Sequence, residues 1–168
     1  MVESGLAQKQ YLIFSIASQQ CAALLEEICE VVLMAELSAP VGLTESLAGI
    51  LNLGGEAIPV LKLNRLLGLQ EFEVGLYSHI ILTRNKEGTV GFLTQAVKKI
   101  QTVSTEDLKP LRFEANLNGF ALAMLPDGRD FIAVLSLKNI ANSCETSVKL
   151  NSNASCLKPM VNATKEAS

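Results

Sequence analysis

The chain has 168 residues, of which 49% are hydrophobic, 18% charged and 5% aromatic, with a mean hydropathy of +0.31. This composition predicts a substantial buried core, in one domain or in two small lobes that share an interface. The formal net charge is −3 and the sequence pI is about 5.2, which argues against nucleic acid as a partner. No apolar stretch approaches the roughly 20 residues that a membrane helix requires, so we expect no direct membrane insertion.

Both ends of the chain are polar. Residues 1–9 form a short polar lead, in which an acid stands where a secretion signal would carry positive charge. Residues 144–168 contain no aromatic side chain and are rich in Ser, Thr, Asn and Lys, which predicts a disordered tail. We therefore expect a cytoplasmic protein with one folded domain over residues 10–143.

Between these ends, short apolar runs rich in Ile, Val, Leu and Phe are separated by Gly, Pro, Asn and Asp. This pattern predicts a mainly β fold. Hairpin turns are expected at residues 85–88 and 126–128, where glycine supplies the positive φ that such turns need. Residues 96–108 fit a helical face or an irregular strand. The expected strands are, in chain order, Tyr11–Ile16, Ala22–Leu25, Ile28–Met34, Glu56–Leu61, Tyr77–Thr83, Thr89–Thr94, Phe120–Leu125 and Phe131–Leu135.

A weak internal repeat relates residues 58–66 to residues 132–140, 74 positions later. Each segment has the pattern of a buried strand that leads into a short helix, and Gly49 and Gly119 precede the two segments by similar distances. The repeat favours two related β lobes, the second starting near residue 77, over one continuous sheet. Chance is the alternative, because any apolar strand before a leucine-rich turn gives the same pattern.

The sequence contains no recognisable catalytic or metal-binding motif. His79 is the only histidine and lies within an expected strand, without a second imidazole or a nucleophile beside it. The four cysteines match no zinc or redox spacing and are expected to be reduced thiols. Asp127 and Asp130 supply too few oxygens for calcium. We therefore expect no catalytic residue, no metal and no cofactor.

Charge is unevenly distributed along the chain. Residues 10–61 contain six glutamates and no Lys or Arg, so the first lobe is expected to be acidic. Lys98, Lys99, Lys109 and Arg112 would make part of the second lobe basic. Such a dipole would steer partners with complementary faces, and the alternative is an ordinary solvated surface.

The run from Gly49 to Leu63, GILNLGGEAIPVLKL, resembles the CheW-like chemotaxis coupling family, whose pattern there is G-x-x-N-L-R-G-x-x-x-P-V-x-D-L. Upstream, Ile28-Cys29-Glu30 is similar to the family's V-x-E, and Pro40 to a proline that precedes the run. Downstream, residues 90–97 are similar to a G-x-x-V-D-x-V strand of the family. The resemblance covers residues 10–142, and its landmarks within the run are Gly49, Asn52, Leu53, Gly55, Pro59, Val60 and Leu63.

The resemblance implies a non-enzymatic adaptor built of two five-stranded, SH3-like β-barrel lobes with short helices. Its partners would be the cytoplasmic tip of a chemoreceptor and the regulatory domain of a CheA-type histidine kinase, at membrane-associated receptor arrays. By this carry-over, the partner-binding positions are Ile28, Glu30, Asn52, Leu53, Gly54, Gly55 and Lys62. The structural positions are Gly49, Pro59, Val60, Gly91, Gly119 and Ser136.

Four positions depart from the family pattern. The arginine of N-L-R-G is Gly54 here, so Glu30 lacks the partner that the resemblance implies for it. A guanidinium places directed donors that glycine lacks, so we expect receptor recognition to change more than the fold. The family's aspartates are replaced by Lys62, Gln95 and Ser136.

The replaced aspartates bear on the ends of the two short helices. Ser136 can still cap the helix that follows it, because a serine hydroxyl accepts a hydrogen bond from a backbone N–H group. Lys62 cannot accept such a bond, so Asn64 is the expected cap in the first lobe.

Two other functions fit the sequence. The domain could have lost kinase coupling and act as a competitor or filler in receptor arrays, which the glycine at position 54 motivates. It could also be a small-molecule-binding β-barrel sensor, although barrels this small are usually filled by their own side chains.

Overall fold

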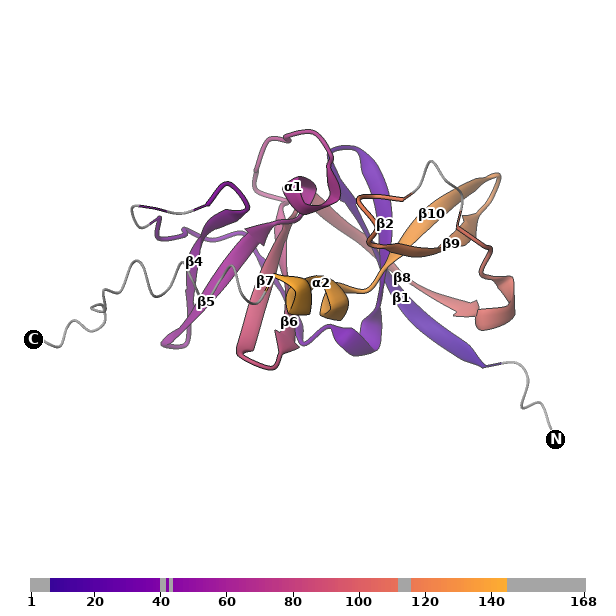
Figure 1. The fold of residues 1–168 in the computed structure, drawn as a ribbon, viewed down its shortest axis with the longest axis horizontal. Coiled ribbons are helices and arrows are strands. Elements are labelled where there is room, and N and C mark those ends of the chain that lie inside the picture. The colour runs from indigo at the N-terminus through magenta and orange to yellow at the C-terminus, as the bar shows by residue number, and fades with distance from the viewer. Residues whose placement is uncertain (1–6, 40–41, 43, 112–115, 145–168) are drawn as a thin grey trace, which may run out of the picture.

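The apolar runs form ten strands in the computed structural model, which describes residues 7–39, 42, 44–111 and 116–144. Two short α-helices and two 3₁₀ turns complete the described part (Figure 1). The elements are β1 (Gln8–Ile16), β2 (Gln19–Leu24), η1 (Leu25–Glu27), β3 (Glu30–Leu33), β4 (Leu47–Leu53), β5 (Glu56–Lys62), α1 (Leu63–Leu67), β6 (His79–Asn85), β7 (Gly88–Thr94), β8 (Ala96–Ser104), η2 (Thr105–Asp107), β9 (Ala121–Asp127), β10 (Asp130–Leu135) and α2 (Leu137–Ser143).

The strands form two five-stranded sheets, so the expected mainly β fold with two five-stranded lobes is confirmed. Sheet A has the order β8-β1-β2-β10-β9, and sheet B has the order β3-β6-β7-β5-β4. Neighbouring strands are antiparallel except for two parallel pairs, β2 with β10 and β5 with β7. The sheets lie side by side, with α1 and α2 between them (Figure 1).

Among the described residues, one isolated bridge joins the two edges of each sheet. In sheet B, Ser38 and Ile50 exchange two backbone hydrogen bonds of 2.9 and 2.7 Å, which link the chain after β3 to β4. In sheet A, Lys109 and Met124 exchange two of 2.8 and 3.0 Å, which link the chain after β8 to β9. Each lobe therefore has one such bridge between its two edges.

The two sheets have the same topology. Each strand of sheet A has a counterpart five strands away in the chain, and the counterparts β3, β6, β7, β5 and β4 occur in this same order in sheet B. The internal repeat is thus a repeat of topology, and its second copy begins with β6 at His79, close to the expected boundary. The lobes do not divide there. Sheet A combines β1 and β2 with β8, β9 and β10, whereas sheet B combines β6 and β7 with β3, β4 and β5. The acidic segment 10–61 is accordingly shared between both sheets and does not form one acidic lobe.

Three apolar cores explain why the strand sequences are so continuously apolar. Alternate residues of β1 face opposite sides: Tyr11 and Ile13 enter a core under sheet A, whereas Leu12 and Phe14 enter a central core between the sheets. In β6, Ile80 and Leu82 enter a core under sheet B, whereas Ile81 enters the central core. Both helices contribute to the central core, through Leu63, Leu67, Leu137, Ile140 and Ala141.

Several expected elements differ from the observed ones. Strand β4 was absent from the expected set, and residues 96–104 are a strand, which resolves the ambiguous segment. Strand β1 begins at Gln8, inside the expected polar lead. Both predicted hairpins are confirmed, with two-residue turns between β6 and β7 and between β9 and β10. Pro40, Arg112 and residues 145–168 lie outside the described residues.

The two helix starts are unlike each other. Ser136 caps α2 through its hydroxyl, which accepts a hydrogen bond of 3.1 Å from the backbone N–H of Asn139. The cap expected from Asn64 is wrong, because α1 has Lys62 at its N-cap position and no side-chain cap. Asn64 is buried and instead donates from Nδ2 to the Gln70 carbonyl at 3.1 Å.

Candidate partner-binding surface

The turn between β4 and β5 contains four of the expected partner-binding positions. Gly54 and Gly55 have φ values of +60° and +91°, the pair of left-handed conformations that a two-residue hairpin of this type requires. Asn52 stabilises the turn by accepting a hydrogen bond of 3.0 Å from the Gly55 backbone N–H. Leu53 packs against the sheet B core, whereas Asn52 and both glycines are exposed. The turn therefore presents backbone and one amide side chain to solvent.

Ile28 and Glu30 lie at the opposite edge of sheet B. Glu30 is exposed at the start of β3, in register with Leu82 of β6. Ile28 packs partly against the central core, and the Cys29 backbone N–H donates to the Leu82 carbonyl at 2.8 Å. Within the described residues, no Lys or Arg is paired with Glu30.

Lys62 ends β5, beside Leu93 of β7 in the middle of sheet B. Its side chain is half-buried, and its backbone N–H donates to the Ser46 carbonyl at 2.7 Å. The seven expected partner-binding positions therefore lie on or directly beside three strands of sheet B: the two edge strands, β3 and β4, and β5, the neighbour of β4. They do not form one cluster along the strand order.

The expected structural positions are nearly all explained by close packing or turns. A Cβ atom on Gly91 would lie 2.8 Å from Ile80 Cγ2 and 3.3 Å from Val60 Cγ2, so only glycine fits between β5 and β6. Pro59 is in register with Ile50 of β4, and Val60 is fully buried in the sheet B core. Gly119 has a φ of +85° in the turn before β9.

Exposed apolar side chains form a feature that sequence reasoning did not identify. Leu33 lies in register with His79, and the Met34 backbone N–H bonds the Ser78 carbonyl at 2.9 Å, so this edge adjoins the segment carrying Leu76 and Tyr77. The exposed fractions are 63% for Leu33, 87% for Leu76 and 79% for Tyr77. Such exposure is typical of contact surfaces. The sequence signal was misleading, because Tyr77 continues the apolar pattern of the following strand.

Sheet A carries a second group of exposed apolar side chains. A shallow hollow of about 350 Å³ is lined by Lys109, Pro110, Leu111, Met124 and Phe131. Leu122 of β9 and Ile100 of β8 are also exposed, by 55% and 53%. Each sheet therefore offers apolar surface to solvent.

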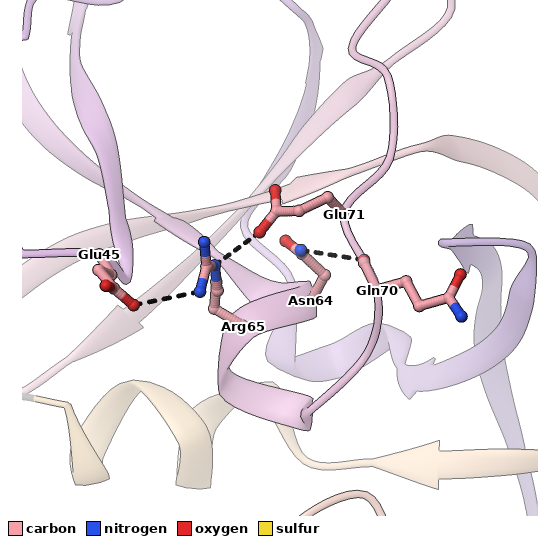
Figure 2. A network of polar contacts seen from close by, with 5 residues as sticks. All are labelled: Glu45, Asn64, Arg65, Gln70 and Glu71. Atoms are coloured by element: carbon pink, nitrogen blue, oxygen red, sulfur yellow. Dashed lines mark hydrogen bonds and ion pairs between the residues drawn. The ribbon is translucent and has the colours of Figure 1, made fainter.

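A polar network holds the start of the loop that follows α1 (Figure 2). The same loop, between α1 and β6, also contains Leu76 and Tyr77. Arg65 of α1 bonds Glu45 through Nη1 at 3.1 Å and Glu71 through Nε at 2.6 Å. The neighbouring Asn64 holds the Gln70 carbonyl. The base of the loop is therefore fixed to α1 by two adjacent residues, one exposed and one buried.

The described residues provide no obvious reactive centre. They include no group of three or more His, Cys, Asp or Glu side chains placed to hold a metal ion. Burial raises the pKa of the Cys21 thiol to about 12, so this cysteine is protonated at neutral pH and a poor nucleophile. Across the described ranges, no helix is both long and apolar enough to cross a membrane.

Comparison with known proteins agrees with this architecture. The chain is similar to the scaffolding protein TtCheW from Thermoanaerobacter tengcongensis, with a TM-score of 0.71 and 20% identity over 82% of this chain and 90% of that one. It is 36% identical over 62 residues to the chemotaxis protein CheW of Rhizobium meliloti (strain 1021). That match spans 37% of this chain and 40% of the relative. The model of the CheW-like domain matches residues 10–145, so the chain belongs to the CheW-like domain family.

Proposed function

We propose that this chain is a non-enzymatic adaptor that couples the cytoplasmic tip of a chemoreceptor to the regulatory domain of a CheA-type histidine kinase. Membership of the CheW-like family supports the proposal, together with the chemotaxis and scaffolding roles that the names of its relatives state. The adaptor would act in the cytoplasm, at membrane-associated receptor arrays.

One observation carries the proposal: exposed apolar side chains occur on both sheets, and the sheets share a buried core. Two separate apolar surfaces on one packed body can hold two proteins in a fixed relative orientation. In this scheme, Leu33 belongs to the surface of sheet B and Phe131 to that of sheet A. Ile28, Glu30, Asn52, Leu53, Gly54, Gly55 and Lys62 are the further positions that we propose to lie at or beside partner contacts.

Binding measurements with both partners test this function. The probes are the purified regulatory domain of the organism's CheA-type kinase and a cytoplasmic fragment of one of its chemoreceptors. Calorimetry should detect each binary complex, and size-exclusion chromatography should detect a complex of all three proteins. Failure of this chain to bind the kinase domain at about 100 μM, where a complex with a Kd of that size would be about half formed, would overturn the proposal.

Three variants assign the surfaces. Leu33→Glu should weaken binding of one partner and Phe131→Glu binding of the other, because a charge in an apolar contact must be desolvated. Lys86→Glu, in the exposed turn between β6 and β7, is the control and should bind both. Loss of both partners in either apolar variant, with folding intact, would contradict two separate surfaces.

The alternative of a decoupled competitor rests on the turn at Gly54. An adaptor of that kind would bind the receptor without raising kinase activity, so a phosphorylation assay on reconstituted arrays separates the two functions. A small-molecule sensor has less support, because apolar side chains fill the core beneath each sheet.

A further inference from the structure

Glu27 lies on one of the connections between the two sheets. It is the last residue of η1, after β2 of sheet A and before β3 of sheet B. A second connection is made by α2, which follows β10 of sheet A and packs against β6 of sheet B. Glu27 contacts both α2 and β6, so it joins the two crossings to each other.

The contacts of Glu27 involve both its side chain and its backbone. The carboxylate accepts hydrogen bonds from the Ser136 hydroxyl at 3.1 and 3.2 Å and from the Lys138 backbone N–H at 3.3 Å. Ser136 in turn accepts from the Asn139 backbone N–H at 3.1 Å. The Glu27 carbonyl accepts from the Thr83 hydroxyl of β6. Bonds to a carboxylate are stronger than neutral ones, so this arrangement fixes the residue in place.

In the part of the chain that the structure describes, the start of α1 has no matching contact. α1 occupies the position in sheet B that α2 occupies in sheet A, and its N-cap Lys62 makes no side-chain cap. The fold of a repeat copy therefore does not require this contact at the helix start. The carboxylate contact therefore distinguishes the start of α2 from that of α1.

The residues directly after Glu27 are those that a partner would meet under the proposed function. Ile28 packs partly on the central core, and Glu30 is exposed on the edge strand β3. With the Glu27 carbonyl held by Thr83 and its carboxylate held by α2, the direction in which the chain leaves η1 is set. Release of the carboxylate would leave Ile28 and Glu30 attached to β6 but would remove their direct link, through Glu27, to the start of α2.

We propose that Glu27 is a positioning residue: by joining the start of α2 to the crossing between the sheets, it holds Ile28 and Glu30 in the orientation that partner binding requires. This inference rests on the proposed adaptor function. It assigns Glu27 no contact with the partner itself.

The test compares four variants of the full-length chain. Glu27→Ala removes the carboxylate, Ser136→Ala removes its main donor, and Glu27→Gln keeps an acceptor oxygen. Glu26→Ala is the matched control, because Glu26 is the adjacent glutamate, is exposed and contacts Lys9 at 3.4 Å. Affinities for the kinase regulatory domain and for the receptor fragment are measured well below the unfolding temperature, and amide hydrogen exchange is followed by mass spectrometry.

Glu27→Ala and Ser136→Ala should each weaken binding of at least one partner about fivefold, and the double variant should be no worse than Glu27→Ala. Amide exchange should accelerate in residues 25–33 and 136–144 of both. Glu27→Gln should restore affinity to within about twofold of the original, and Glu26→Ala should leave it unchanged. Ser136→Ala keeps the test open if Glu27→Ala fails to fold.

If the original chain binds its probes, either of two results would overturn the inference. One is a lowered unfolding temperature with unchanged affinity, which would make Glu27 a stabilising residue only. The other is a loss of affinity in Glu26→Ala equal to that in Glu27→Ala. This result would show that the loss comes from removing a negative charge and not from releasing the start of α2. Failure of the original chain to bind either probe would instead overturn the adaptor function, and unchanged amide exchange in Glu27→Ala would then still reject the positioning role.

Discussion

Gly49 lies directly against the backbone of Ser38, at the bridge that joins the two edges of sheet B. A Cβ atom on residue 49 would lie 2.6 Å from the Ser38 carbonyl oxygen and 2.8 Å from Leu37 Cβ. The same carbonyl accepts the Ile50 backbone N–H at 2.7 Å. The closest approach of the two chain segments therefore depends on the absence of a side chain at position 49.

Gly49→Ala is expected to destabilise the protein by about 1–3 kcal/mol, because the backbone at the bridge must move to admit a methyl group. Urea unfolding followed by circular dichroism measures the change. Gly75→Ala is the control, since a Cβ there meets nothing within 4 Å, and it should change stability little. Equal effects of both substitutions would contradict the steric reason.

Asn64, which is buried, and Arg65, which is exposed, both bind the loop after α1, so their contributions to stability can be compared. Asn64→Ala should lower the free energy of unfolding by about 1–3 kcal/mol, because it removes a buried amide side chain together with its hydrogen bond to the Gln70 carbonyl. Arg65→Ala should cost about 0–1 kcal/mol, since both of its glutamate partners are exposed. Thermal unfolding at low and high salt should show a salt dependence that Arg65→Ala reduces and Asn64→Ala does not. A larger loss from Arg65→Ala would reverse the assignment.

The burial of the Cys21 thiol leads us to expect a loss of stability at alkaline pH. Burial raises the pKa of its thiol from 9.0 to about 12, so between these values the unfolded chain releases a proton that the folded chain retains. The unfolded state then binds fewer protons, and stability falls as pH rises from 9 towards 12. Cys21→Ala should flatten this part of the stability curve relative to the original chain. A thiol reagent at pH 8 should modify exposed Cys29 rapidly and Cys21 only on unfolding; equal rates would contradict the burial.

The sequence predicted the class of fold and most strands because continuous apolar runs reflect strands buried on both faces, as in β1. It predicted both hairpins from their turn residues: Asn85 and Gly88 in the first, and Gly128, with a φ of +62°, in the second. Asn85 accepts the backbone N–H groups of Glu87 and Gly88 at 2.8 and 3.0 Å, which is local chemistry that four residues specify. The family landmarks around Gly49 were equally local.

The rest depended on contacts between distant residues. Strand β4 was missed because Gly49 and Asn52 interrupt its apolar pattern, and its place is fixed by pairing with β5 and by the bridge to Ser38. Asn64 was misassigned because its partner, Gln70, is a loop carbonyl that no periodicity reveals. For the candidate site, the sequence named positions along the chain, but not their distribution over β3, β4 and β5 or the bridge of Ser38 to Ile50 that joins the two edges of sheet B.

The exchange of strands between the halves makes a prediction about folding. Neither residues 1–76 nor residues 77–168 should form a stable sheet alone, because each sheet needs strands from both. Mixing the two fragments should restore the circular dichroism spectrum of the intact chain. A titration of one fragment with the other should reach its end point at equimolar amounts. A fragment that unfolds cooperatively by itself would show that its strands can form a core without exchange.

Gly54→Arg is the substitution that tests the missing guanidinium. The turn has space for it, since a Cβ on Gly54 meets nothing within 4 Å. The φ of +60° opposes any side chain, so Gly54→Arg and Gly54→Ala should both lose about 1–2 kcal/mol of stability. Only the arginine adds directed donors, so a gain in affinity for the receptor fragment in Gly54→Arg but not in Gly54→Ala would support a chain that is adapted to weak receptor coupling. Equal affinities in both variants would remove Gly54 as a reason to regard this chain as decoupled, and the adaptor function would then depend on the apolar surfaces alone.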